Sequence, residues 1–176
     1  MSQDTLQEIL ASYRSGECTA EEVADTLRKS SIADLGFANV DLDRSRRRGV
    51  PEVIFGENKT PEHITEIIGA LRDAQQNILA TRISPEVADA VISASEGIPL
   101  VYDSLARCIY TERPNTDLGV GRILVVCAGT SDLPVAAEAG LTARLCGNTV
   151  DTLNDVGVAG LHRLLGHLDT LRSANV

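Results

Sequence analysis

The feature that most constrains this chain is residues 122–132, which have the pattern of a strand that turns directly into a helix. Residues 123–126 form an apolar run rich in β-branched side chains, typical of a strand covered on both faces in a parallel sheet. Gly129 ends this run, and residues 130–132 supply helix N-cap side chains before an apolar helical pattern over residues 133–145. We therefore predict a strand–turn–helix unit here.

This predicted turn has chemistry that suits an anion. Free backbone N–H groups and the positive end of a helix dipole would lie beside the hydroxyls of Thr130 and Ser131, as in a phosphate cradle. If a nucleotide binds, we expect these hydroxyls to meet its phosphate and Asp132 to meet ribose hydroxyls. An ordinary capped turn explains the same residues, because the single Gly129 is no dinucleotide fingerprint and no Walker lysine follows it.

The charge and hydropathy of the chain argue against several classes of protein. Its 176 residues carry a formal net charge of −9, whereas a general nucleic-acid binder needs a positive surface. Its polar N-terminus has no basic-then-apolar leader, and there is no apolar run of about eighteen residues. We expect a soluble, cytoplasmic protein with neither nucleic acid nor a membrane as partner.

The four cysteines (Cys18, Cys108, Cys127 and Cys146) form no C-x-x-C pair and have no histidine at metal-ligand spacing. A zinc site and a disulfide framework are therefore not expected, and we interpret Cys127 and Cys146 as packed thiols.

The pattern divides the chain into four segments. Residues 1–34 are predicted to be a helical arm, with a first helix ending near Gly16 and a capping box at Thr19-Ala20-Glu21-Glu22 starting the second. This arm is either an interaction hairpin or simply packs on its neighbour. Residues 35–111 are predicted to be a small α/β domain, residues 112–121 a Gly- and Pro-containing linker, and residues 122–176 part of a parallel-sheet domain.

Within the α/β domain, Thr60-Pro61 and Ser84-Pro85 mark two helix starts. Strands are expected near residues 40–42, 53–55, 78–83, 100–102 and 106–111. Four arginines (Arg44, Arg46, Arg47 and Arg48) form a basic cluster, expected in a loop. They could contact a phosphate or adenylate, but pairing with the nearby Asp41, Asp43 and Glu52 is the simpler interpretation.

After the first predicted helix, residues 149–153 are expected to form a second strand and residues 155–160 a second glycine-bearing turn. Leucines at helical spacing then predict one amphipathic helix from Leu161 to Leu171, and Asn175-Val176 begins a third strand. Two parallel strands are too few to cover both sheet faces. We therefore expect a truncated, incomplete sheet that would be aggregation-prone or marginally stable alone.

Several strings, in order, closely resemble the LarB family, the pyridinium-3,5-biscarboxylic acid mononucleotide synthases of nickel-pincer-nucleotide biosynthesis. The strings are residues 48–61 (RGVPEVIFGENKTP), 80–85 (ATRISP), 128–136 (AGTSDLPVA) and 155–165 (DVGVAGLHRLL). The part from Arg122 onward is also similar to the PurE-like phosphoribosylaminoimidazole carboxylases. The resemblance implies an α/β fold in which a small N-terminal unit precedes the first βαβα portion of a flavodoxin-like, PurE-like sheet.

The resemblance also implies site residues. Gly129, Thr130, Ser131 and Asp132 would bind a mononucleotide moiety, Arg163 would line the same pocket, and Gly157 and Gly160 would let the backbone approach. His162 would assist proton transfer, although an exposed histidine in a first helical turn is an equally good interpretation. We expect the pairs Ser131-Asp132 and His162-Arg163 to converge on one pocket.

The implied reaction adds carbon dioxide to the pyridinium ring of nicotinic acid adenine dinucleotide and hydrolyses its phosphoanhydride to release AMP. Family members use a cysteine thiolate and a Gly-Met-Glu-Gly glutamate that have no counterpart in these residues, so we expect no carboxylation by this chain alone. The resemblance implies Mg²⁺, carbon dioxide as co-substrate, no tightly bound cofactor and no protein-held metal, and a homo-octamer. The alternatives are a purine-pathway carboxylase or mutase and a non-catalytic nucleotide-binding or assembly module.

Overall fold

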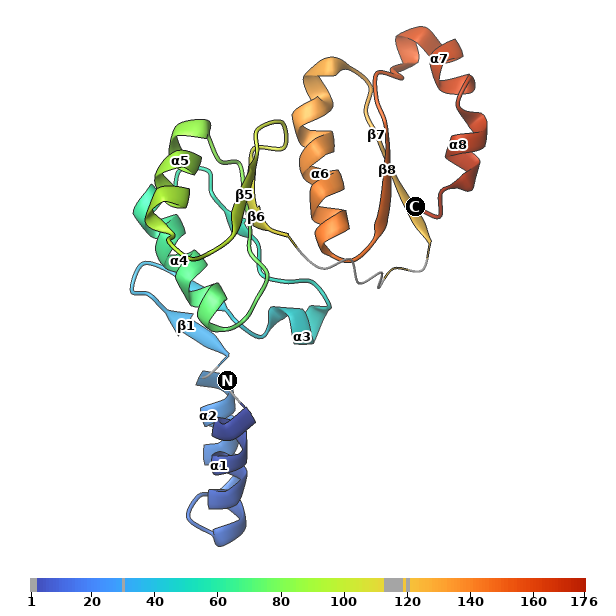
Figure 1. The fold of residues 1–176 in the computed structure, drawn as a ribbon. Coiled ribbons are helices and arrows are strands. Elements are labelled where there is room, and N and C mark those ends of the chain that lie inside the picture. The colour runs from blue at the N-terminus through green and yellow to red at the C-terminus, as the bar shows by residue number, and fades with distance from the viewer. Residues whose placement is uncertain (1–2, 30, 113–118, 120) are drawn as a thin grey trace.

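The computed structural model of the chain describes residues 3–29, 31–112, 119 and 121–176. Its body is a stack of alternating helical and sheet layers, from which a helical hairpin projects (Figure 1). The hairpin consists of α1 (Gln3–Ser15) and α2 (Ala20–Lys29). The predicted capping box starts α2, since the Thr19 N–H donates to Glu22 Oε2 at 2.7 Å and the Glu22 N–H donates to Thr19 Oγ1 at 3.2 Å.

The N-terminal unit begins with a hairpin of β1 (Ile32–Asp34) and β2 (Asn39–Asp41), of which the sequence predicted only the second strand. A mixed sheet follows, in the order β3-β4-β6-β5. Its strands are β3 (Ile54–Phe55), β4 (Leu79–Thr81), β5 (Leu100–Asp103) and β6 (Cys108–Thr111). Only the β3–β4 pair is parallel, and the pairs that β6 makes with β4 and β5 are antiparallel.

Two helices cover one face of this mixed sheet (Figure 1). They are α4 (Pro61–Asp73) and α5 (Pro85–Ala94), and each begins at the predicted cap-and-proline signal. Thr60 accepts the His63 N–H and Ser84 accepts the Val87 N–H. The fully buried side chains Ile64, Ile68 and Leu71 of α4 form the centre of this unit's core.

The C-terminal unit contains the predicted strand–turn–helix. Strand β7 (Arg122–Val126) pairs in parallel with β8 (Thr149–Leu153), and between them lie the short 3-10 turn η1 (Thr130–Asp132) and helix α6 (Leu133–Leu145). Asn175-Val176 lies against the free side of β7, where the Leu124 N–H donates to Val176 O at 2.8 Å. The predicted burial of residues 123–126 on both faces is wrong, because Ile123, Leu124 and Val125 are half-buried and Val126 is exposed.

Helix α6 is shared by the two units. It lies between the mixed sheet and the β7–β8 pair (Figure 1). Leu141 and Leu145 pack in one buried cluster with Leu79, Ala106 and Cys108 of the N-terminal unit. On its other side, a Cβ added at Gly140 would lie 3.8 Å from both Val150 and Thr152 of β8. The layers therefore run from α4 and α5 through the mixed sheet, α6 and the β7–β8 pair.

The last helical segment differs from the prediction. One helix was expected from Leu161 to Leu171, but the turn η2 (Val158–Gly160) is followed by two short helices, α7 (Leu161–Leu165) and α8 (Leu168–Ser173). Gly166 and His167 separate them, and the Gly166 N–H closes the end of α7 on His162 O at 3.0 Å. Because Leu161, Leu165 and Leu168 are exposed, no packing holds a single continuous helix together.

No helix among residues 3–29, 31–112 and 121–176 has the length and apolarity needed to span a membrane.

Candidate functional site

The first predicted turn closes on itself through Asp132. The Gly129 N–H donates to Asp132 Oδ2 at 3.0 Å, and the Asp132 N–H donates back to Gly129 O at 3.0 Å. One carboxylate oxygen is therefore already used inside the turn, and the other lies 3.5 Å from Ser131 Oγ. The residues Thr130 and Ser131 are exposed. The turn thus presents two hydroxyls to solvent, and the Asp132 carboxylate holds its backbone in this conformation.

The second predicted turn lies directly beside the first. The Val156 N–H donates to Cys127 O at 3.2 Å, and the Gly157 N–H donates to Ala128 O at 2.9 Å. A Cβ added at Gly157 would lie 2.9 Å from Ala128 O, which is too close for a side chain. The two turns therefore meet at the carboxyl ends of β7 and β8, where open α/β sheets bind their ligands.

A side-chain contact that the sequence did not reveal joins the same two turns. The Cys127 thiol donates to Asn154 Oδ1 at 3.3 Å. Cys127 is buried, as predicted, and Asn154 is exposed. The contact orients the Asn154 amide at the edge where the turns meet. No local motif predicts it, because the two residues come from different strands.

The His162-Arg163 pair does not join the first turn. Arg163 Nη1 lies 2.7 Å from Asp155 Oδ2 within its own turn, and the guanidinium lies so close to Gly160 that a Cβ there would be 2.7 Å from Arg163 Nε. His162 is exposed. Across the described chain, no hydrogen bond or ion pair links His162 or Arg163 to Ser131 or Asp132. The turns that carry both pairs are adjacent, and their convergence on one ligand pocket stays a prediction.

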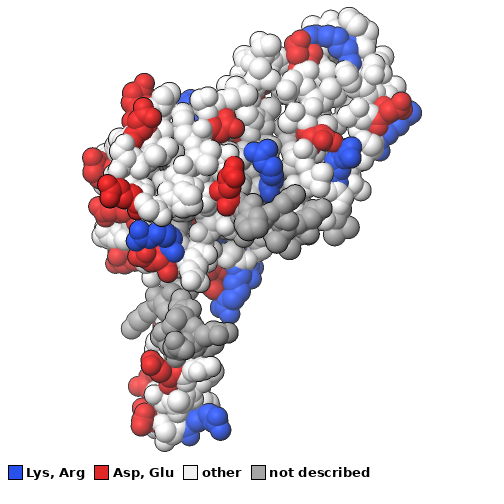
Figure 2. Space-filling model, in the orientation of Figure 1, with Lys and Arg blue, Asp and Glu red and all other residues white. Residues whose placement is uncertain are grey.

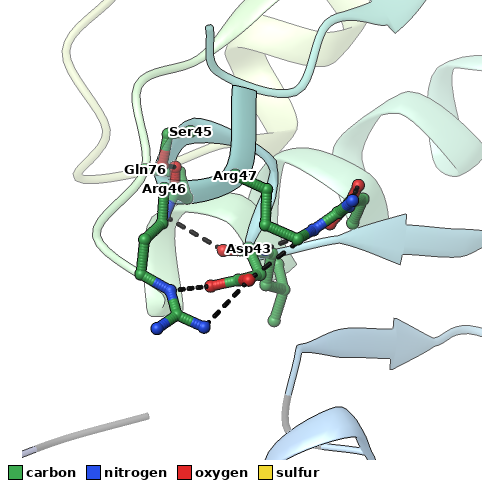
Figure 3. A network of polar contacts seen from close by, with 7 residues as sticks. Asp43, Ser45, Arg46, Arg47 and Gln76 are labelled. Atoms are coloured by element: carbon green, nitrogen blue, oxygen red, sulfur yellow. Dashed lines mark hydrogen bonds and ion pairs between the residues drawn. The ribbon is translucent and has the colours of Figure 1, made fainter. Parts of the chain in front are cut away.

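The arginine cluster is paired with acids, and it forms the short helix α3 (Arg44–Arg48) where a loop was predicted. Arg46 Nε lies 2.7 Å from Asp43 Oδ1, and Arg47 pairs with Asp41 and Asp43 (Figure 3). Arg44 Nη1 lies 3.7 Å from Glu52 Oε2. The hydrogen bond from Arg46 lowers the pKa of Asp43. These ion pairs confirm the pairing interpretation for Arg44, Arg46 and Arg47. Helix α3 lies at the opposite end of the body from α7 (Figure 1).

A different arginine of the N-terminal unit lies near the turns. Arg82 follows β4 directly, and its Nε lies 2.9 Å from Glu138 Oε2 of α6. Beneath this pair Cys108 is fully buried, and burial raises the pKa of its thiol to about 12. Cys108 is thus an unreactive core thiol. Figure 2 shows that acidic side chains of the visible face gather over the α4 and α5 side of the N-terminal unit, away from this junction.

Metal and disulfide chemistry have little support in the described residues. Cys18, Cys108 and Cys127 are free thiols, and Cys146 is only half-buried. Within residues 3–29, 31–112 and 121–176, no three His, Cys, Asp or Glu side chains gather as a metal cage. A Mg²⁺ that entered with a substrate would depend on the substrate's own phosphates.

Comparisons with known proteins agree with this architecture. The chain is 27% identical to an uncharacterized protein of Methanocaldococcus jannaschii, in an alignment that covers 97% of this chain and 69% of the archaeal protein. Residues 32–113 match the family model described as the LarB/PurE-like N-terminal domain. This match covers β1 to β6 with α3, α4 and α5. Residues 32–113 therefore carry a LarB/PurE-like N-terminal domain, which confirms the resemblance for this part of the chain.

Proposed function

We propose that this chain binds nicotinic acid adenine dinucleotide as part of a PurE-like enzyme that carboxylates the pyridinium ring and releases AMP. The observation that carries the proposal is the 2.9 Å hydrogen bond from Gly157 N to Ala128 O, which holds two glycine-bearing turns together at the ends of parallel strands. The LarB/PurE-like N-terminal domain supports the pyridinium substrate over a purine-pathway substrate.

In the proposed complex, each residue of the turns has a binding role. The exposed Thr130 and Ser131 hydroxyls donate to a phosphate oxygen. Asp132, held by the Gly129 N–H, keeps the turn in shape and accepts from a ribose hydroxyl. Arg163 adds positive charge once a ligand phosphate competes with Asp155 for its guanidinium. His162 exchanges a proton with bound substrate, which is the role that the resemblance implies.

Ligand binding tests the proposal directly. Isothermal titration with nicotinic acid adenine dinucleotide should give saturable binding to the full chain, and Ser131→Ala should weaken it about tenfold, as expected for a lost hydrogen bond to a charged group. Ser93→Ala, an exposed serine of α5, is the matched control and should bind normally.

The outcome also separates the alternatives. Tighter binding of aminoimidazole ribonucleotide would favour the purine-pathway reaction instead. Binding of neither ligand, together with assembly onto a LarB-family enzyme, would favour a non-catalytic role.

A further inference from the structure

Arg82 has an unusual backbone and a position that ties the two units together. Its φ is +59°, in the left-handed region that costs a residue with a side chain about 1 kcal/mol or more. Its guanidinium crosses from the N-terminal unit to Glu138 of α6, at 2.9 Å from Nε to Oε2. The side chain remains 40% exposed, so the contact with Glu138 does not bury it.

The carboxyl ends of β4, β7 and β8 lie at the same end of the body. Helix α6 runs back from the end of β7 to the start of β8, so it is antiparallel to both strands. The α6 residues Leu141 and Leu145 share a cluster with Leu79, the first residue of β4, whereas Glu138 pairs with Arg82, which follows its last residue. Strand β4 therefore also runs antiparallel to α6, and Arg82 is near the turns that start α6.

The distance between Arg82 and the first turn is short. Glu138 comes five residues after Leu133, the first residue of α6, which is roughly 8 Å along the helix axis. The Arg82 guanidinium, which pairs with Glu138, is therefore separated from the Thr130 and Ser131 hydroxyls by about the first two turns of α6. A ligand that extends beyond one phosphate at the turn, along α6 toward the N-terminal unit, would meet Arg82.

Two nitrogens of the Arg82 guanidinium remain available to bind a ligand. Only Nε of Arg82 has a partner among the described residues, which leaves the N–H groups of Nη1 and Nη2 to bind another acceptor. The backbone of Arg107 lies beside the residue that follows Arg82, since the Ile83 N–H donates to Arg107 O at 2.8 Å. The Arg82 guanidinium supplies a positive charge at this edge, in a chain whose net charge of −9 would repel an anionic ligand.

We propose that Arg82 binds the second phosphate of a dinucleotide whose first phosphate lies at the Thr130–Ser131 turn. This inference rests on the proposed function and extends it, because it makes the N-terminal domain part of the substrate site. The planar fork of arginine suits a phosphate with two oxygens presented side by side. Glu138 holds Arg82 through Nε and leaves this fork directed away from the pair.

The test compares a dinucleotide with a mononucleotide on the same variants. Binding of nicotinic acid adenine dinucleotide and of nicotinic acid mononucleotide is measured by titration for the full chain, Arg82→Gln and Arg144→Gln. Arg144 is exposed near the far end of α6 and is the matched control. We expect Arg82→Gln to weaken the dinucleotide tenfold or more without changing the mononucleotide. Arg144→Gln should change neither.

A second variant distinguishes binding from folding. Glu138→Gln removes the same ion pair but keeps the guanidinium, so the dinucleotide affinity should stay within about threefold of the full chain's. If Glu138→Gln weakens the dinucleotide as much as Arg82→Gln does, Arg82 has only a structural role and the inference is wrong. It is also wrong if Arg82→Gln leaves dinucleotide binding intact or weakens both ligands equally. If the unsubstituted chain binds neither ligand, the proposed function itself fails.

Discussion

The close approach of the two turns in the candidate site depends on a glycine, which has no side chain. Gly157 lies between the two turns, and its N–H reaches Ala128 O at 2.9 Å only because no Cβ intervenes. Gly160 has a similar role under the guanidinium of Arg163. Glycine at position 157 allows a contact between the two turns, and glycine at position 160 allows one within the second turn.

Gly157→Ala should separate the two turns. Its Cβ would lie 2.9 Å from Ala128 O, so the backbone must shift, and we expect a loss of about 1–3 kcal/mol in the free energy of unfolding. Dinucleotide affinity should fall with it, since the hydroxyls of the first turn lose their relation to the second. Chemical denaturation and titration measure both effects.

Gly69→Ala is the matched control for this substitution. Gly69 lies within α4, and a Cβ there would meet nothing within 4 Å. Because alanine favours a helix over glycine, we expect Gly69→Ala to be neutral or to stabilise the protein by up to about 1 kcal/mol. Equal destabilisation by both substitutions would contradict the role given to Gly157.

The Asp43 carboxylate should make stability depend on pH. The hydrogen bond from Arg46 lowers its pKa in the folded chain, so the charged form is stabilised by folding. This stabilisation is fully present above the carboxylate's ordinary pKa and is lost as the pH falls through the lowered folded-state value.

Asp43→Asn should therefore unfold slightly more easily at pH 7, by a small amount because the pair is exposed. The two denaturation curves should converge in acid, below the lowered pKa. A difference between them that persists in acid would show that the carboxylate charge is not its cause.

Helices α4 and α5 show how far local chemistry determines an element. Each begins at a hydroxyl residue followed by proline, and the structure places the N-cap exactly at Thr60 and Ser84. These signals act between near neighbours, so the sequence alone predicts them. Strand β1 carries no such signal, because its three residues alternate poorly and depend on pairing with β2.

Replacing threonine by valine should have different effects on stability at Thr60, the N-cap of α4, and at Thr65 within the helix. Thr60 Oγ1 accepts the His63 N–H at 3.3 Å, so Thr60→Val removes an N-cap and should cost about 1 kcal/mol. Thr65 Oγ1 is buried without a hydrogen-bond partner in the described structure. Thr65→Val removes that buried hydroxyl and should be neutral or stabilising.

Thermal denaturation of both valine variants measures this contrast. Valine and threonine have similar helix propensities, so each position serves as the control for the other. Destabilisation by Thr65→Val of the size found for Thr60→Val would contradict the interpretation of the two hydroxyls.

Some residues of the candidate site can be predicted from their neighbours in the sequence, and others only from contacts between distant parts of the chain. Gly129, Thr130, Ser131 and Asp132 were predicted because a strand, a glycine and cap residues follow one another in the chain. Asn154 and Arg82 were not assigned to the site, because their partners Cys127 and Glu138 are 27 and 56 residues away. Such contacts arise only when the layers pack.

Helix α6 is the element that makes the two units one structure. It carries only two charged residues, Glu138 and Arg144, and small or apolar side chains lie on its other faces. A helix that is apolar on most sides is expected to be buried, but the sequence does not say between which layers. The structure places it between the mixed sheet and the β7–β8 pair, so both sheets depend on it.

Leu141→Ala should therefore weaken both units at once. Leu141 is buried in the cluster that contains Leu79 and Cys108, and truncating it leaves a cavity that should cost about 2–4 kcal/mol. Because α6 also supports β8, hydrogen exchange should accelerate together in β4, β6, β7 and β8, with a single unfolding transition. Leu165→Ala removes the same atoms from an exposed site and should change stability by less than about 0.5 kcal/mol. Two separate transitions, with faster exchange in only one sheet, would show that α6 does not couple the units.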